Sequence, residues 1–382
     1  MCLRTIVFAV LSLMFCLAAQ AQFAAAATYY VAPDGNDSNP GTEAKPWKTP
    51  QKASQSVQPG DTVLFAPGLY SIGETWQVRC AGTADKPITF KGCGKDKAEV
   101  RINASTVLPS GGWKPHKGAI YQIEMGEKAM SVFQNGVPLA HDTKSNEINS
   151  VDDMHVNSFY KKGSTLYVWL ADGSDPNKSE MRVADSHVVS LHAANYTVFE
   201  GLTLEFGFVG FKEQKDTHHV TIRNCILRSL SSQGIQPIPA NCLIEGNLFQ
   251  KIGASRFQHG MYGSRPGIIV RNNIFEEISG AAIHQYGGGK KEGDGWEISG
   301  NIFRKPRQYA SKKGFGNYTD LILWALDGNK VFNNEFHGEG KRKVASLQSS
   351  NNRIYSNKFI GCPSPVSGGK GGGNEIRDNV VQ

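Results

Sequence analysis

One six-residue pattern of apolar and polar positions recurs along the second half of the chain. It has the form I-x-x-N-x-F, and five copies carry it: Ile244–Phe249, Val270–Phe275, Ile298–Phe303, Val331–Phe336 and Ile354–Phe359. Weaker copies flank them: Val198–Thr203, Ile222–Leu227 and Ile376–Val381. A unit of 22 or more residues that lengthens only by insertion is typical of a solenoid. Because apolar and β-branched residues alternate within each copy, the pattern predicts short strands and an all-β fold, a parallel β-helix.

The fourth position of the pattern is usually asparagine. It is Gly201 and Cys225 in the first two weak copies, and then Asn247, Asn273, Asn301, Asn334, Asn357 and Asn379. An asparagine beside a strand suits a turn residue in the left-handed backbone region. Side-chain amides stacked along the axis can also hydrogen-bond to one another. We therefore expect one column of asparagines at a turn of the solenoid.

The sequence divides into four parts. Residues 1–27 are a predicted signal peptide, and 28–110 form an N-terminal cap with the first coils. Residues 111–185 form an inserted antiparallel β segment, and 186–382 form the regular coils. The first part has an arginine, an apolar run and small residues, which are typical of a secretory signal. The second includes a predicted helix at Pro50–Val57. The inserted part breaks the repeat, and its Asn135-Gly136 pair predicts a hairpin turn.

Charge and hydropathy narrow the class of partner. The net charge of +7 and the pI near 8.9 favour an acidic partner such as a polyanionic glycan. No motif that combines aromatic and basic residues indicates nucleic-acid binding. Beyond residues 1–27, no apolar stretch is long enough to cross a bilayer, so membrane insertion is not expected. The sequence thus predicts a secreted or periplasmic protein, and we expect a monomer.

Five cysteines remain after the signal, and an odd number prevents complete pairing within the chain. Cys80 and Cys93 flank a short loop and are candidates for a disulfide in an oxidising compartment. Alternatively, all five are small core residues. No C-x-x-C motif or His/Cys spacing indicates zinc, and we expect neither a metal nor a cofactor.

A second short pattern follows each copy of the first. Glycine or alanine precedes an apolar residue and then a variable one, as in Gly210–Lys212, Gly234–Gln236, Gly260–Tyr262 and Ala282–His284. If the apolar residues point into the core, the variable ones form an outward row: Lys212, Gln236, Tyr262 and His284. Tyr286 lies two residues further along its strand, and the next coil is expected to add Trp324. At ~4.8 Å per coil, such a row spans roughly 14 Å, enough for several sugar units.

Cationic residues surround this row. They include Lys215, His218, His219, Arg256, His259, Arg265, Lys290 and Lys291, and the segments 254–258 and 304–316 are expected to wall the face. Elimination on a uronic acid needs a group that neutralises the carboxylate, a base for the C5 proton and an acid for the leaving oxygen. Tyr262, His284 and His259 supply the proton-transfer groups, whereas Lys212, Gln236, Arg256, Arg265, Tyr286 and Trp324 are candidates for substrate binding. Alternatively, these are only stacking or hydrogen-bonded surface groups, and His259 points inward.

The segment Tyr29–Tyr70 and the stretch from Phe133 to Leu202 resemble secreted right-handed parallel β-helix proteins of the pectate-lyase-like superfamily. The resemblance implies the fold but not the substrate, since its members include lyases, epimerases, polygalacturonases and non-catalytic tailspikes. Pectate lyases hold calcium with clustered aspartates, and no such cluster occurs near the row. Polygalacturonase motifs match poorly, for example at Asn317–Asp320. Lyases of the chondroitinase-B type pair a lysine base with an arginine, which Lys212 or Lys215 with Arg256 or Arg265 could mimic.

The sequence therefore predicts a polysaccharide lyase that cleaves an acidic, uronate-containing glycan by β-elimination. Two alternatives stay open. One is a glycoside hydrolase of the same fold, which would need two carboxylates at a defined separation. The other is a non-catalytic surface protein whose outward row only stacks against sugars.

Overall fold

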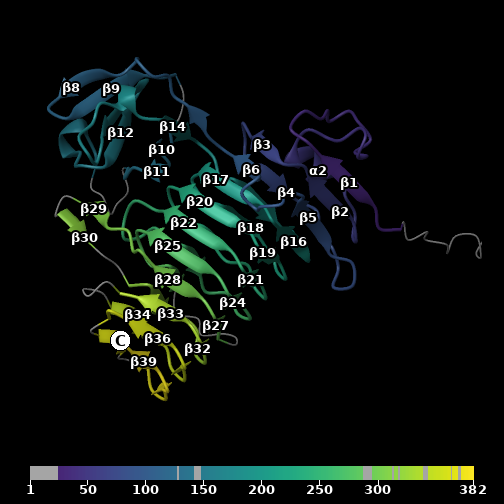
Figure 1. Ribbon diagram of the computed structural model, residues 1–382, viewed down its shortest axis with the longest axis vertical. Coiled ribbons are helices and arrows are strands. Elements are labelled where there is room, and N and C mark those ends of the chain that lie inside the picture. The colour runs from purple at the N-terminus through teal and green to yellow at the C-terminus, as the bar shows by residue number, and fades with distance from the viewer. Residues whose placement is uncertain are drawn as a thin grey trace, which may run out of the picture.

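The computed structural model describes residues 25–126, 129–141, 148–286, 295–311, 314–316, 319–338, 343–362, 364–368 and 371–382. The predicted signal peptide, residues 1–27, falls almost wholly outside these residues and stays a prediction. Three parallel sheets wind about a common axis from the purple N-terminal coils to the yellow C-terminal coils (Figure 1). The predicted parallel β-helix is confirmed. No helix among the described residues has the length and apolar character needed to span a membrane.

The first sheet has eleven strands among the described residues: β1 (Thr28–Val31), β2 (Thr62–Phe65), β5 (Ile88–Gly92), β16 (Thr197–Glu200), β19 (Thr221–Arg223), β21 (Leu243–Glu245), β24 (Ile269–Arg271), β27 (Glu297–Ser299), β32 (Lys330–Phe332), β35 (Arg353–Tyr355) and β38 (Glu375–Arg377). The second has ten: β3 (Gly68–Ser71), β6 (Val100–Asn103), β17 (Thr203–Gly207), β20 (Ile226–Leu230), β22 (Leu248–Ile252), β25 (Ile274–Ile278), β28 (Ile302–Arg304), β33 (Glu335–His337), β36 (Lys358–Ile360) and β39 (Val380–Val381).

The third sheet is interrupted and consists of two runs. One run holds β4 (Trp76–Val78), β15 (Val189–His192) and β18 (Phe211–Lys215), and the other holds β23 (Met261–Gly263), β26 (Ile283–Gln285), β31 (Leu321–Leu323), β34 (Lys343–Leu347) and β37 (Ser364–Gly368). Single parallel bridges from Phe211 to Ile235 and from Ile235 to Met261 connect the runs. The third sheet is therefore continuous in register although Ile235 lies outside a named strand.

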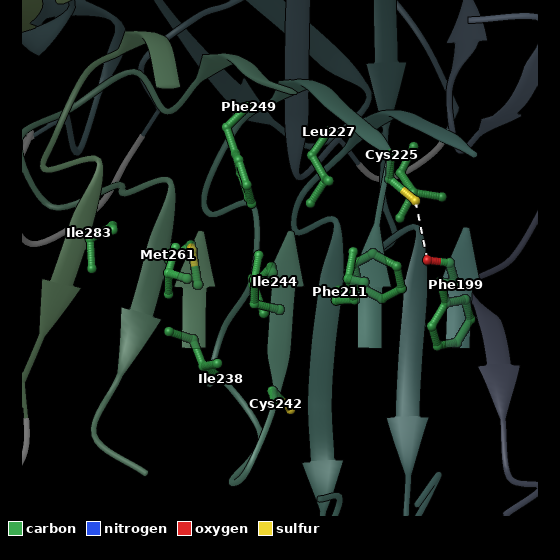
Figure 2. Close-up of a cluster of buried hydrophobic side chains, with 14 of the residues drawn as sticks. Phe199, Phe211, Cys225, Leu227, Ile238, Cys242, Ile244, Phe249, Met261 and Ile283 are labelled. Carbon is green, nitrogen blue, oxygen red and sulfur yellow. Dashed lines mark hydrogen bonds between the residues drawn. The ribbon is translucent and has the colours of Figure 1, made fainter. Parts of the chain in front are cut away.

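The six-residue pattern fills the interior at three positions. The phenylalanines stack in one column through the second sheet, with neighbouring ring centroids 4.5–5.2 Å apart: Phe249, Phe275, Phe303, Phe336 and Phe359. The first-position residues, such as Ile244, are buried in the first sheet. Figure 2 shows Ile244 and Phe249 packed in the same core as Phe211, Met261 and Ile283 of the third sheet. The repeat thus encodes one continuous apolar core.

The asparagines form the predicted column, and the predicted ladder is confirmed. Asn273 is fully buried; its Oδ1 accepts hydrogen bonds of 2.9 Å from the backbone N–H and the side-chain amide of Asn247. Its own amide donates to Asn301 Oδ1 and to the Ile244 carbonyl. The same links continue through Asn334 and Asn357 to Asn379. Each ladder asparagine thereby satisfies buried backbone groups of its neighbouring coil.

Two details of the predicted register are wrong. The left-handed residues are not the ladder asparagines but the residues just before them, such as Gly246, Asn272 and Gly300. A ladder asparagine must point inward, whereas the turn itself falls on the preceding residue. In addition, Phe199 rather than Val198 pairs with Ile222. The first weak copy is therefore shifted by one residue, and Leu202, not Gly201, holds its fourth position.

The first coils carry a cap. The helix α2 (Pro50–Ser56) lies at the expected position; the Thr49 side chain accepts a hydrogen bond from Lys52 N, and Pro50 occupies the first turn. Cys80 and Cys93 are free thiols, so the candidate disulfide between them is not formed. Burial raises the pKa of the Cys80 thiol to about 12. Its placement against the core favours the alternative in which this cysteine is a packing residue.

The inserted part between β6 and β15 consists of antiparallel strands and two short 3₁₀ helices: β7 (Thr106–Val107), β8 (Lys114–Lys117), β9 (Ile120–Glu124), β10 (Ser131–Gln134), β11 (Val137–Pro138), η1 (Val151–Asp153), β12 (Ser158–Lys162), β13 (Thr165–Trp169), η2 (Pro176–Lys178) and β14 (Met181–Ala184). Asn135 and Gly136 join β10 to β11 with positive φ angles, as the hairpin prediction requires. The insertion lies against β17, β20 and β22 (Figure 1). A further hairpin, β29 (Tyr309–Ser311) with β30 (Gly314–Gly316), projects from a later coil.

Candidate active site

The outward row of the third sheet exists in the predicted register. Ser190 pairs with Lys212, the bridge residue Ile235 precedes Gln236, and Tyr262 pairs with His284. The row continues to Gln77 on the N-terminal side and to Ile322 on the C-terminal side. Lys212, Gln236 and Tyr262 are each half-buried. Because the residues before them point into the core, the coil spacing itself brings these four side chains onto one face.

Tyr262, His284 and His259 form a tight aromatic cluster. The rings of Tyr262 and His284 are perpendicular, with centroids 5.2 Å apart. His259 stacks on Tyr262 at 5.5 Å and meets the His284 ring edge-on at 4.5 Å. Since His259 is only 2% exposed and His284 only 7%, the histidines lie beneath the tyrosine. His259 therefore points inward, as the alternative prediction stated.

A hydrogen-bond chain fixes the tautomer of both histidines. The backbone N–H of Ala281 donates to His259 Nδ1 at 2.9 Å, so this nitrogen carries no proton. Burial and the neighbouring His284 hold the pKa of His259 well below its usual value, so the ring is neutral and its proton sits on Nε2. That Nε2–H donates to His284 Nδ1 at 3.0 Å. The proton of neutral His284 must then be on Nε2.

The free end of this chain is a buried proton donor. His284 Nε2 has no hydrogen-bond partner among the described residues and is screened from solvent. Burial lowers the pKa of His284 to about 4, so the ring stays neutral at ordinary pH. Burial and nearby Tyr286 raise the pKa of the Tyr262 hydroxyl above its usual value, which keeps that group protonated. At neutral pH the cluster therefore offers two adjacent donors and no charge of its own.

An aromatic platform lies beside the cluster. Tyr286 is 47% exposed, and its ring centroid lies 6.1 Å from that of Tyr262. Trp324 lies edge-on to His284 at 5.5 Å, and its Nε1–H donates to Ser346 Oγ at 3.2 Å. The outward position of the next coil itself belongs to Ile322; Trp324 comes two residues later, beside Tyr286. Exposed aromatic faces of this kind suit the apolar faces of sugar rings.

Lys212 lies two coils from Tyr262 and has a histidine neighbour. Burial lowers the pKa of the Lys212 amine, although Glu213 beside it opposes the shift. Burial and the Lys212 charge together lower the pKa of His187 to about 4. The His187 ring packs on Phe208, which in turn stacks on His141 of the insertion. The inserted part therefore lies near the Lys212 end of the row.

The two candidate arginines lie further from the cluster. Arg256 is exposed and rests over the Phe257 ring at 4.6 Å. Arg265 is also exposed and approaches the buried carboxylate of Glu213 at 3.7 Å. Lys290 and Lys291 lie outside the described residues. Of the predicted cations, Lys212 is the one that shares the outward row of Tyr262 and His284.

Sequence reasoning missed His187, Gln77 and His192. His187 precedes β15 without any motif around it, and its nearness to Lys212 depends on how two coils stack. Gln77 Oε1 lies 2.6 Å from His192 Nε2, although 115 residues separate them. Only the register of β4 with β15 could have linked these residues.

The described side chains are not well arranged to bind a metal ion. Among the described residues, no group of three or more His, Cys, Asp or Glu side chains is arranged to hold a metal ion. The clustered carboxylates that calcium requires are thus not matched here, and we derive no step through a metal. In the described part of the outward row, from Gln77 to Ile322, there is also no carboxylate to act as a glycosidase acid or nucleophile.

Comparisons with known proteins agree with this fold. A family model described as "Pel9A-like, right handed beta helix region" matches residues 29–235, more than half of the chain. Among solved structures, one titled "Glycoside hydrolase" has a TM-score of 0.60 at 11% identity and covers 93% of this chain and 96% of that chain. The structure of pectate lyase Pel9A has a TM-score of 0.51 at 13% identity, covering 92% and 79%. At these identities the likeness concerns the fold.

Short stretches of the sequence are similar to curated proteins. The uncharacterized protein YwoF of Bacillus subtilis (strain 168) is 45% identical over 62 residues, which are 16% of this chain and 13% of that protein. Pectate lyase L of Dickeya dadantii (strain 3937) is 38% identical over 77 residues, which are 20% of this chain and 17% of that protein. The stretches aligned to the first two curated relatives span only 13% and 17% of their length. What those proteins do therefore bears on this chain only as a proposal.

Proposed function

The chain belongs to the Pel9A-like family of right-handed β-helix proteins, and from this premise we propose that it is a polysaccharide lyase. Its substrate is an acidic, uronate-containing glycan, which it cleaves by β-elimination. The observation that carries the proposal is the chain from Ala281 N–H through His259 to His284. It holds a neutral proton donor beside the protonated hydroxyl of Tyr262 on the outward row.

The elimination divides among three side chains. Neutral Lys212 takes the C5 proton, and the electrons of that C–H bond form the C4–C5 double bond. The bond from C4 to the glycosidic oxygen breaks, and Tyr262 gives its proton to the leaving oxygen. Once substrate displaces the side chains that screen it from solvent, His284 Nε2–H donates a hydrogen bond to the uronate carboxylate, where negative charge develops. Tyr262 then recovers its proton from the Lys212 ammonium through solvent, which restores both groups.

Lys212 suits the role of base better than that of a fixed cation. Its pKa is lowered by burial, so a larger share of the amine is neutral than in an ordinary lysine. The opposite reasoning applies to His284, whose outer nitrogen carries a proton and cannot accept another. Lys212 and Tyr262 stand two coils apart, or ~10 Å between backbones, and long side chains can reach one sugar from both positions.

The direct test is to incubate the protein with a panel of uronate polymers and neutral glucans. Elimination leaves an unsaturated sugar end that absorbs ultraviolet light, so absorbance should rise together with the number of reducing ends. New reducing ends without absorbance would replace the lyase with a glycoside hydrolase. Binding without any cleavage would leave the non-catalytic glycan-binding protein.

The binding alternative has one specific observation in its favour. Tyr286 is exposed and Trp324 lies next to it, and such a platform can hold sugars without chemistry. A binder of this kind would not need the buried, tautomer-fixed His284. The decisive comparison is therefore between variants of the platform and variants of the cluster.

A further inference from the structure

A large cavity lies at the N-terminal end of the same face. Its volume is about 1140 Å³, and it opens between α2 on one side and strands β3 and β4 on the other. Gln77 belongs both to the lining of this cavity and to the outward row that leads to Tyr262. Counted along the row, Gln77 is four coils from Tyr262, or ~19 Å.

The walls of the cavity are held in place by hydrogen bonds. Gln77 N donates to Gln51 Oε1 at 2.8 Å, and Ser54 Oγ donates to the Gln77 carbonyl at 2.9 Å. Trp76 is 1% exposed, and its Nε1–H donates to Ser54 Oγ at 3.1 Å. Helix α2 and strand β4 are thereby locked together, so the cavity exists before any ligand arrives.

The lining and the face beside it are basic. Lys48 and Arg79 line the cavity and are exposed, with Glu74 as the acidic member of the lining. Burial lowers the pKa of His192, and the charge of nearby Arg79 lowers it further. His192 pairs in register with Lys215 on the next strand. A second line of basic groups thus runs beside the outward row, from the cavity toward the Tyr262 cluster.

We propose that this cavity is a distal subsite for an acidic glycan, which binds a carboxylated sugar several residues away from the bond that is cleaved. This inference deepens the proposed function and rests on it. Lys48 and Arg79 meet sugar carboxylates, while Leu69 and Pro33 supply apolar contact for the sugar ring. A chain that fills both the cavity and the Tyr262 cluster gains contacts that a short oligosaccharide cannot make, so long chains are the preferred substrates.

Two kinds of variant test the subsite. Gly73 lines the cavity, and a Cβ atom added there meets no atom within 4 Å, so Gly73→Phe is expected to occupy cavity space without a clash at its Cβ. Gly126 is an equally open glycine in the inserted part, and Gly126→Phe is its control. Arg79→Gln removes a lining charge, and Arg353→Gln removes an exposed arginine of the first sheet as its control.

Affinity and kcat/KM are measured for short and long oligogalacturonates. We expect Gly73→Phe and Arg79→Gln each to lower the long-to-short ratio of affinity about five- to tenfold, and both controls to keep the wild-type ratio. Equal ratios for all proteins would overturn the subsite, even if the wild type is a lyase. A lower long-to-short affinity ratio in the two subsite variants, found for a wild type that binds but never cleaves, would support the subsite and overturn the lyase. A wild type that binds no uronate chain would overturn both.

Discussion

His259 Nε2 donates its proton to His284 Nδ1 at 3.0 Å, and this contact decides what His284 can do. A histidine whose inner nitrogen accepts a hydrogen bond keeps its proton on the outer nitrogen. His284 is therefore a donor toward the substrate, and His259 acts through it without touching the sugar. His259 is therefore a positioning residue, and His284 is the member of the pair that contacts the substrate.

Replacing His259 tests this division. His259→Phe removes the donor to His284 and leaves the Ala281 N–H unsatisfied, at a cost of ~1–3 kcal/mol in stability. We expect kcat to fall by about 10–100-fold with little change in KM, because substrate does not contact residue 259. His259→Gln restores an amide donor and should recover part of kcat. A KM effect without a kcat effect, or no advantage of glutamine over phenylalanine, would contradict the positioning role.

Tyr262→Phe separates catalysis from stacking. The phenylalanine ring keeps the contacts with His259 and His284 but has no proton to give. We expect turnover to fall by ~10²–10⁴-fold while glycan binding is retained. Near-normal turnover would mean that the ring only stacks on sugar. Tyr286→Phe is a matched control, since Tyr286 is a neighbouring aromatic with no assigned proton transfer.

Lys212 should control the pH dependence of turnover. Its pKa lies below the ordinary lysine value, so kcat should rise with pH and level off before an exposed lysine would titrate. The acid limb should not follow His284, which stays neutral down to its pKa of about 4. Lys212→Gln is expected to abolish turnover and leave the uronate polymer bound. A pH-independent kcat, or an active Lys212→Gln enzyme, would mean that Lys212 is not the general base and that Tyr262 is the better candidate for that role.

Stability should fall as the solution becomes acidic. His284 and His187 have pKa values of about 4 in the folded chain and an ordinary value of 6.5. Between these pH values the unfolded state binds more protons than the folded state. The contribution of the two histidines to the free energy of unfolding is therefore fully present above pH 6.5 and is lost as the pH falls toward 4. Denaturant titrations at several pH values check this. His284→Gln should flatten the slope in that window; a variant with the wild-type slope would mean that other groups dominate.

The asparagine ladder should contribute to stability at each rung. Asn273→Leu removes the acceptor of the Asn247 backbone N–H and side-chain amide, and the side-chain donor to the Ile244 carbonyl. An unsatisfied buried group costs ~1–3 kcal/mol, so the variant should lose at least that much free energy of unfolding. Asn333→Gly is the control, because Asn333 is exposed and its φ of 55° suits glycine. Equal melting temperatures for Asn273→Leu and wild type would count against the ladder.

The repeat alone determined the solenoid, its inward columns and the outward row. Each of these depends on residues that recur at a fixed phase within a coil, as Asn273, Phe275 and Tyr262 do, and phase is visible in a linear sequence. The shifted copy at Val198 shows the limit: one weakly patterned coil gave no signal to choose between two registers. The stacking of β16 on β19 made the choice, since only Phe199 aligned with Ile222 fills the core.

The direction of the hydrogen bonds and the extent of burial came only from the tertiary structure. Nothing in the sequence relates Ala281 N–H to His259 or distinguishes the buried His284 from the exposed Tyr286 two residues later. The same holds for His187 beside Lys212 and for Gln77 in the lining of the cavity next to α2. These relationships join residues of different coils, and their protonation depends on desolvation, which no local pattern encodes. The periodic sequence fixes which face a side chain occupies, whereas the packing between coils decides its charge and its partner.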